Sequence, residues 1–256
     1  MGIQGAPWAQ NIALAVALGY LVAVVFFGSY KKRFSLFSFR LEWAVLRKMF
    51  YLSTPGGVRH FIGLGAYLVF FRIVEQMGTV DLAVANIGRA VFNFQFMPVL
   101  GIGFAGSSLV SRNLGQKRPL QAEANTWHAY QLATLVSVAV YVIVAVFAPE
   151  IASVFTEDPH VAHLAVGCFR IGGLFLVLMP AGMIFAATLE GAGNIWLVLG
   201  FEAVCCAIYL GCAWLFGITW GEGVTGAYAA ETVYWLVFGT VCAAFFLRRA
   251  WHHTKV

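Results

Sequence analysis

Charged side chains are scarce in this sequence. Asp, Glu, Lys and Arg make up 11% of its 256 residues, whereas soluble domains average about 25%. Hydrophobic residues reach 61%, and a soluble fold of this size has too little interior to hide so much apolar surface. Lipid removes this conflict. The composition therefore excludes an ordinary soluble domain and predicts an integral membrane protein.

Motifs for catalysis and metal binding are also missing. The five cysteines lie in apolar runs, without a CxxC pair or an accompanying histidine cluster, so we expect them to be small packing residues. HExxH, GxSxG and paired catalytic acids do not occur, which argues against a membrane-embedded enzyme. We therefore expect no catalytic residues, no metal and no organic cofactor. In a membrane protein, the net charge of +5 bears on orientation in the bilayer rather than on a nucleic-acid partner, and we expect none.

Long apolar runs, in contrast, are abundant. A membrane-spanning helix needs about 20 mostly apolar residues, and the qualifying stretches are 8–30, 56–77, 80–110, 124–148, 161–189, 195–218 and 224–247. They predict an all-α fold, a polytopic membrane helix bundle of about seven transmembrane helices. Because only a tight turn at 77–79 separates the second and third stretches, we expect these two helices to be antiparallel neighbours.

Basic and acidic residues alternate between successive connections. Lys and Arg occur in 31–48, 112–118 and 248–255, whereas the intervening connections carry acids, for example at 81, 150–158 and 222. The positive-inside rule places the basic connections and the C-terminus in the cytoplasm and the N-terminus outside. The connection at 191–194 has no basic residue and is placed by alternation alone. We expect a multi-pass protein of the plasma membrane, the inner membrane of a bacterium.

A basic linker separates the first apolar stretch from the other six. Within it, apolar residues at 41, 45, 46, 49 and 50 recur at helical spacing, which predicts a short amphipathic helix on the inner membrane surface. The chain should then comprise the last helix of an N-terminal lobe (1–30), a cytoplasmic linker with this helix (31–54), a six-helix C-terminal lobe (55–249) and a cytoplasmic tail (250–256). The N-terminal lobe would be missing from this chain or supplied by another chain.

Short segments between about residues 46 and 249 follow the order of a known family. They are 52–55 (LSTP), 77–83 (MGTVDLA), 96–98 (FMP), 101–105 (GIGFA), 109–116 (LVSRNLGQ), 155–158 (FTED), 169–171 (FRI), Pro180 and 189–194 (LEGAGN). In this order they resemble the multidrug and toxic compound extrusion (MATE) transporters. The resemblance implies two six-helix lobes related by pseudo-twofold symmetry, of which this chain would contain the last helix of the first lobe and the whole second lobe.

The resemblance also bears on the coupling ion. Sodium-coupled members carry a Glu in the middle of the second helix counted here and an Asp near the middle of the fifth. The corresponding stretches, 63–66 (GLGA) and 177–179 (VLM), hold no acid. The proton-coupled branch has its key Asp in the first lobe. Either H⁺ or Na⁺ therefore remains open as the coupling ion.

Two carboxylates lie inside predicted spans, where a charge is costly and a functional role is the default expectation. Glu202 lies close to the middle of 195–218, and Glu231 lies about two turns into 224–247. They are the candidates for binding the coupling ion. The alternative is a carboxyl group that is hydrogen-bonded to a neighbouring helix for structural reasons.

Four further ionisable residues are candidates for a gate or for structural ion pairs. Arg170 lies deep in 161–189 and needs a carboxylate or a carbonyl partner. Arg72 and Glu75 are three residues apart, so they can pair on one helical face. Arg89, across the tight turn, is a candidate to join this pair.

Prolines and aromatic residues suggest where a substrate cavity lies. Polar amides precede a proline in the third span, and a second proline interrupts the fifth; kinked helices facing a cavity form mid-membrane sites in transporters. Aromatic faces suit flat organic cations, although tolerated prolines and packing aromatics are an equally ordinary explanation. The cavity candidates are Tyr67, Asn93, Gln95, Phe96, Pro98 and Pro180.

Together these features favour a secondary active antiporter that couples the efflux of amphipathic, often cationic organic compounds to a cation, by alternating access. Its expected partners are small organic substrates, the lipid bilayer and the N-terminal lobe. One alternative is a lipid-linked oligosaccharide flippase of the same superfamily. Another is an inactive remnant of a half-transporter.

Overall fold

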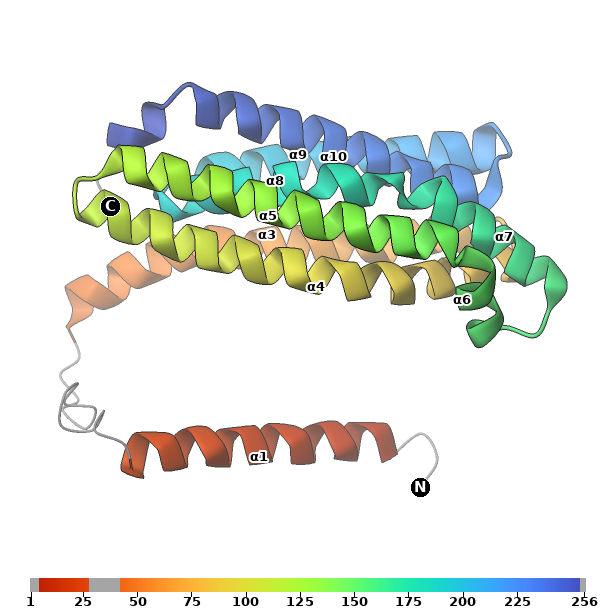
Figure 1. Cartoon of the computed structure of the whole chain (residues 1–256), viewed down its shortest axis with the longest axis horizontal. Helices are drawn as coiled ribbons and strands as arrows, with labels where there is room; N and C mark the ends of the chain where they lie inside the picture. Colours follow the sequence, from red (N-terminus) through yellow and green to blue (C-terminus); the bar gives the residue numbers. More distant parts are fainter. Residues whose placement is uncertain (1–4, 28–41, 254–256) are drawn as a thin grey trace. The chain divides into compact units, whose positions relative to one another are not determined.

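The computed structural model describes residues 5–27 and 42–253, and this part of the chain is helical with no strand (Figure 1). Seven of the described helical stretches are long and apolar enough to cross a membrane. This result confirms the predicted fold class, a multi-pass bundle of membrane helices. The chain divides into two compact units, Met1–Met49 and Phe50–Val256.

The first unit contains α1 (Gly5–Phe27), a helix with no charged residue. Apolar side chains on all its faces are exposed, as expected for a helix whose solvent is lipid. The next described helix, α3 (Trp43–Glu75), begins in this unit and continues into the second.

The amphipathic segment predicted at 41–50 is helical from Trp43 onward, but it is not a separate helix. No glycine or proline interrupts residues 43–54, so α3 runs without a break into the following span. Pro55 lies inside α3, where a membrane helix tolerates proline. The predicted position of this segment on the inner membrane surface stays a prediction.

The second unit is a bundle of long helices that run along a common direction (Figure 1). After α3 come α4 (Thr79–Gly115), α5 (Pro119–Val146), the short α6 (Ala148–Phe155), α7 (Pro159–Arg170), α8 (Phe175–Gly191), α9 (Ile195–Trp214) and α10 (Gly223–Leu247). Helix α8 packs against α4, α5 and α10, and α10 also packs against α9. In the span Pro159–Gly191, 61% of the most apolar stretch of 18 residues is buried, whereas the corresponding share is at most 33% in the other spans. The core of the bundle therefore surrounds α8.

The fifth span is interrupted by a short 3₁₀ turn, Gly172–Leu174, between α7 and α8. A Cβ atom on Gly172 would lie 2.8 Å from the Cβ of Tyr228, so the glycine permits the close approach of α10. The bend was predicted at Pro180, but α8 continues through this buried proline. Likewise, α4 continues through Pro98. Neighbouring helices can re-satisfy the backbone groups that proline frees.

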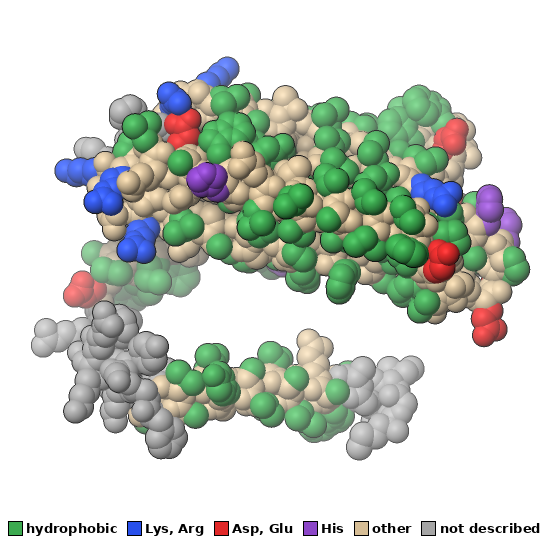
Figure 2. Space-filling model, in the orientation of Figure 1, with side chains coloured by type: hydrophobic (Ala, Val, Ile, Leu, Met, Phe, Trp, Pro, Cys, Tyr) green, Lys and Arg blue, Asp and Glu red, His purple; other side chains and the backbone are tan. Residues whose placement is uncertain are grey.

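Charges separate between the two ends of the bundle. Lys117 and Arg118 lie between α4 and α5, and Arg248 follows α10, whereas Asp158 and Glu222 precede α7 and α10 at the other end. Figure 2 shows Lys and Arg mostly at one end and most acids and histidines at the other. We call these the basic end and the acidic end. The separation agrees with the loop pattern of the sequence, and the side of the membrane that each end faces stays a prediction.

Candidate functional site

Three helices of the second unit, α3, α9 and α10, meet at the carboxylate of Glu202 in α9. Arg59 of α3 donates from Nε to Glu202 Oε2 at 3.3 Å, and Tyr234 of α10 donates from its hydroxyl to Oε1 at 2.7 Å. Arg59 also forms an ion pair with Glu190 near the end of α8. The Glu202 side chain is 9% exposed. Two carboxylates thus share one guanidinium, which gives this group a formal charge of −1.

A second buried carboxylate, Glu231 of α10, has a guanidinium to itself. Arg89 of α4 donates to Glu231 Oε1 at 2.9 Å, and the Tyr209 hydroxyl of α9 donates to the same oxygen at 3.2 Å. Aromatic rings surround the cation: Arg89 Cζ lies 5.1 Å from the Tyr67 ring centroid, and the rings of Phe70 and Tyr228 are within 6 Å. This pair is formally neutral, and the three rings shield the guanidinium, whose side chain is 21% exposed.

The two groups are neighbours inside the bundle. Tyr234 follows Glu231 by three residues on α10, so the two side chains lie on one helical face. The rings of Tyr209 and Tyr234 contact each other with centroids 5.9 Å apart. We call the resulting sequence of contacts the polar track; in order from the basic end it comprises Glu190, Arg59, Glu202, Tyr234, Tyr209, Glu231 and Arg89.

The other ion-pair candidates lie away from this track. Arg72 Nη1 contacts Glu75 Oε2 at 2.8 Å, which confirms their predicted pairing, but both side chains are more than half exposed. Arg89 does not join them, because it turns toward Glu231. Arg170 is exposed and donates from Nε to the carbonyl of Ala145 at 3.3 Å, the carbonyl partner that its position required.

The six candidates for a substrate cavity differ in burial and in their contacts. Gln95 is fully buried and donates to the carbonyl of Ser137 at 3.1 Å, and Pro180 is buried in α8. Asn93 and Pro98 are exposed, and Phe96 is half-buried. Tyr67 belongs to the aromatic shell of Arg89. Their role in binding substrate stays a prediction.

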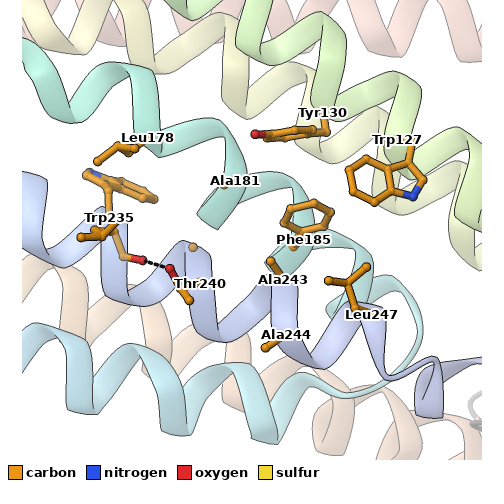
Figure 3. Close-up of a pocket in the computed structure, with 12 residues that line it drawn as sticks. Trp127, Tyr130, Leu178, Ala181, Phe185, Trp235, Thr240, Ala243, Ala244 and Leu247 are labelled. Carbon is orange, nitrogen blue, oxygen red and sulfur yellow. Dashed lines mark hydrogen bonds between the residues drawn. The ribbon is translucent and has the colours of Figure 1, made fainter.

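A groove of about 410 Å³ lies elsewhere in the bundle, between α5, α8 and α10 (Figure 3). None of the six cavity candidates lines it. Its walls are almost entirely apolar, and aromatic rings from all three helices face it. Trp127, Tyr130, Phe185 and Trp235 supply these rings.

Sequence reasoning selected Glu202, Glu231 and Arg89 but missed most of their partners. Arg59 lies near the start of the second predicted span, and Glu190 lies just beyond the end of the fifth. The available signal was their position, since a charged residue at the end of an apolar span calls for a partner of opposite charge. Hydropathy carries no signal for the two tyrosines, Tyr209 and Tyr234.

Comparison with known proteins adds independent findings. The MatE family model matches residues 57–215. The probable multidrug resistance protein NorM of Thermotoga maritima is 26% identical over 196 residues, which are 76% of this chain and 42% of that protein. Protein DETOXIFICATION 29 of Arabidopsis thaliana is 24% identical over 190 residues, 73% of this chain and 36% of that protein. The chain therefore spans less than half the length of these curated relatives.

Solved structures share the fold. A multidrug resistance MATE family transporter in an outward-facing conformation superposes with a TM-score of 0.86 at 21% identity, covering 97% of this chain and 56% of that chain. A MOP superfamily transporter from Pyrococcus furiosus gives the same TM-score, identity and coverage. At this level of identity the likeness concerns the fold alone.

Proposed function

Because this chain belongs to the MatE family, whose members are transporters and not enzymes, we propose that it forms the C-terminal lobe and one preceding helix of an efflux antiporter. The antiporter exports amphipathic, often cationic organic compounds in exchange for a cation that moves inward. Alternating access between two lobes would expose the transport site to each side in turn. The N-terminal lobe completes the cavity, either from the same protein or from another chain.

The charge count around Glu202 is the observation that supports cation coupling. Arg59 is shared by Glu190 and Glu202, so one negative charge lacks a counter-charge within this group. A net charge is costly inside a membrane protein. A proton or a sodium ion bound between the two carboxylates neutralises it. Glu202 is therefore the proposed coupling residue.

Glu231, the second candidate for ion coupling, has a different environment. Arg89 balances its charge, and the Tyr209 hydroxyl occupies the same carboxylate oxygen. A cation that entered here would have to compete with the guanidinium. We assign Glu231 and Arg89 to holding α4, α9 and α10 together, with coupling as the role of Glu202.

The coupling ion has a route from the basic end. Glu190 and Arg59 are each 28% exposed, whereas Glu202 is 9% exposed. An ion arriving at this end reaches Glu190 first and passes Arg59 to Glu202. By the positive-inside rule the basic end faces the cytoplasm, so this route is the exit of the ion after inward transport. The C-terminus then lies in the cytoplasm and the N-terminus outside.

Glu202→Gln in the transporter that contains this lobe tests the proposal. We expect efflux of a fluorescent cationic dye from cells to fall to background while the membrane content of the protein, measured by immunoblot, is unchanged. Glu75→Gln is the matched control, since it makes the same substitution in an exposed ion pair. Normal efflux by Glu202→Gln would remove Glu202 from the mechanism.

Everted vesicles then distinguish the two ions. Dye uptake driven by a pH gradient without sodium would assign H⁺, and uptake driven by a sodium gradient at equal pH would assign Na⁺. Uptake that neither gradient drives would contradict cation coupling.

A further inference from the structure

The apolar groove between α5, α8 and α10 opens along the outside of the bundle. Four residues on its α10 side are exposed: Leu236, Thr240, Ala244 and Leu247. The Thr240 hydroxyl donates a hydrogen bond to the carbonyl of Leu236. Aromatic rings from α5 and α8 form the opposite wall (Figure 3). An exposed apolar groove in a membrane helix bundle suits the hydrocarbon chains of a lipid.

The length of the groove corresponds to one leaflet. Along α10 it extends from Leu247, the last residue of the helix, back to Trp235. At a rise of about 1.5 Å per residue this is about 18 Å, and one leaflet contributes about 15 Å of hydrocarbon. The groove therefore reaches from the basic end to about the middle of the membrane.

Basic residues lie at the end of the bundle where the groove begins. Helix α5 begins directly after the exposed Lys117 and Arg118, and α10 ends directly before Arg248, whose Cζ lies 5.1 Å from the Phe245 ring centroid. Arg249 bonds Glu123 at 2.8 Å and so ties the end of α10 to the first turns of α5. This charge attracts an anionic headgroup and repels a cationic transport substrate.

We propose that the groove is a binding site for an anionic phospholipid of the leaflet at the basic end. One acyl chain lies in the groove against the aromatic wall formed by Trp127, Tyr130 and Phe185. The phosphate lies at the mouth, within reach of Arg118 and Arg248. The lipid joins α5 to α10 over the buried α8, which makes it a structural ligand of this lobe.

Native mass spectrometry of the detergent-purified chain measures this binding. Dioleoyl phosphatidylglycerol is the anionic probe, and dioleoyl phosphatidylcholine, which has the same acyl chains but no net charge, is the comparison. We expect one high-affinity phosphatidylglycerol per chain. Arg248→Gln should weaken its binding about fivefold, the effect of one basic residue near an anionic headgroup. Arg112→Gln removes an exposed charge from α4 at the same end and should leave this binding unchanged.

Ala244→Phe fills the groove from an exposed position. It should weaken the binding of both lipids by at least about tenfold, because several methylene groups lose their apolar contact. Ala207→Phe, at an exposed position of α9 outside the groove, is the matched control and should bind lipid normally. If Ala244→Phe does not yield folded protein, Thr240→Phe makes the same test at a second exposed groove position.

Equal affinity for the two lipids overturns the headgroup assignment, and normal binding by the groove-filling variants overturns the site. Displacement of phosphatidylglycerol by a transported cationic dye would assign the groove to substrate instead. A second protein chain retained in place of lipid would assign it to an interface. Each of these two results contradicts the proposal.

Discussion

Replacing Arg89 by methionine should destabilise the helix bundle more than any other single change in the polar track. The Glu231 side chain is 9% exposed, and Arg89 is its charged partner at 2.9 Å. In Arg89→Met the carboxylate keeps the hydroxyl of Tyr209 but loses its counter-charge. Removing one partner of a buried ion pair costs about 3–5 kcal/mol, because the other charge is left uncompensated.

The reverse substitution should cost less. In Glu231→Met the guanidinium still faces three aromatic rings, the nearest centroid being 5.1 Å away, and cation–π contacts contribute about 0.5–2 kcal/mol each. The double variant Arg89→Met/Glu231→Met leaves no buried charge at this site. Replacing a whole buried pair by apolar residues is often neutral or stabilising, so we expect the double variant to be more stable than Arg89→Met.

Thermal unfolding in detergent, followed by intrinsic fluorescence, measures these differences. For a chain of this size about 1 kcal/mol corresponds to about 2–4 °C, so Arg89→Met should lower the Tm by about 6–20 °C. The same cycle on the exposed pair Arg72 and Glu75 should change stability by at most about 1 kcal/mol. A single Arg89 variant as stable as the wild type, or a double variant less stable than both singles, would refute the reasoning.

Three further substitutions test other parts of the bundle. Gly172→Ala places a Cβ 2.8 Å from the Cβ of an α10 tyrosine. This overpacking should cost about 1–3 kcal/mol of stability, measured as a lower Tm. Gly211→Ala, with open space around it, should leave the Tm unchanged. Gln95→Leu should leave the range of exported dyes unchanged, since this amide is fully buried and, among the described residues, its Oε1 has no hydrogen-bond partner; a changed range would return Gln95 to the substrate cavity. Tyr234→Phe removes the hydroxyl that donates to the proposed coupling carboxylate. It should slow dye efflux about tenfold at a saturating cation gradient, because the carboxylate then holds its cation more tightly. An unchanged rate of efflux would exclude that hydroxyl from coupling.

Hydropathy predicted the fold because each span is a local property of the sequence. About 20 apolar residues in a row suffice to identify a spanning helix, and seven such helices occur in the described part of the chain. The break in the fifth span is not local. It lies at Gly172–Leu174 rather than at Pro180, because the close packing of α10 against the glycine requires knowledge of which helices are neighbours.

The candidate site likewise contains local contacts, which the sequence predicts, and contacts between distant residues, which it does not. Arg72 and Glu75 are three residues apart, and helical geometry alone predicts their contact. Arg89 lies 142 residues from Glu231, and Arg59 lies 143 residues from Glu202. The expense of a charge in lipid indicates that such residues need partners, but the choice of partner depends on how α3, α4, α9 and α10 pack.

The two ends of the polar track differ in a way that suits a coupled transporter. The pair of Arg89 and Glu231 is neutral and lies against aromatic rings, so we do not expect its charge to change during transport. The group around Glu202 carries an excess carboxylate and changes its net charge whenever a cation binds or leaves. Helix α10 contributes to both groups, through Glu231 and Tyr234. In the proposed mechanism a charge change at Glu202 therefore acts on a helix that the neutral pair also holds, and this would link ion binding to a movement of packed helices.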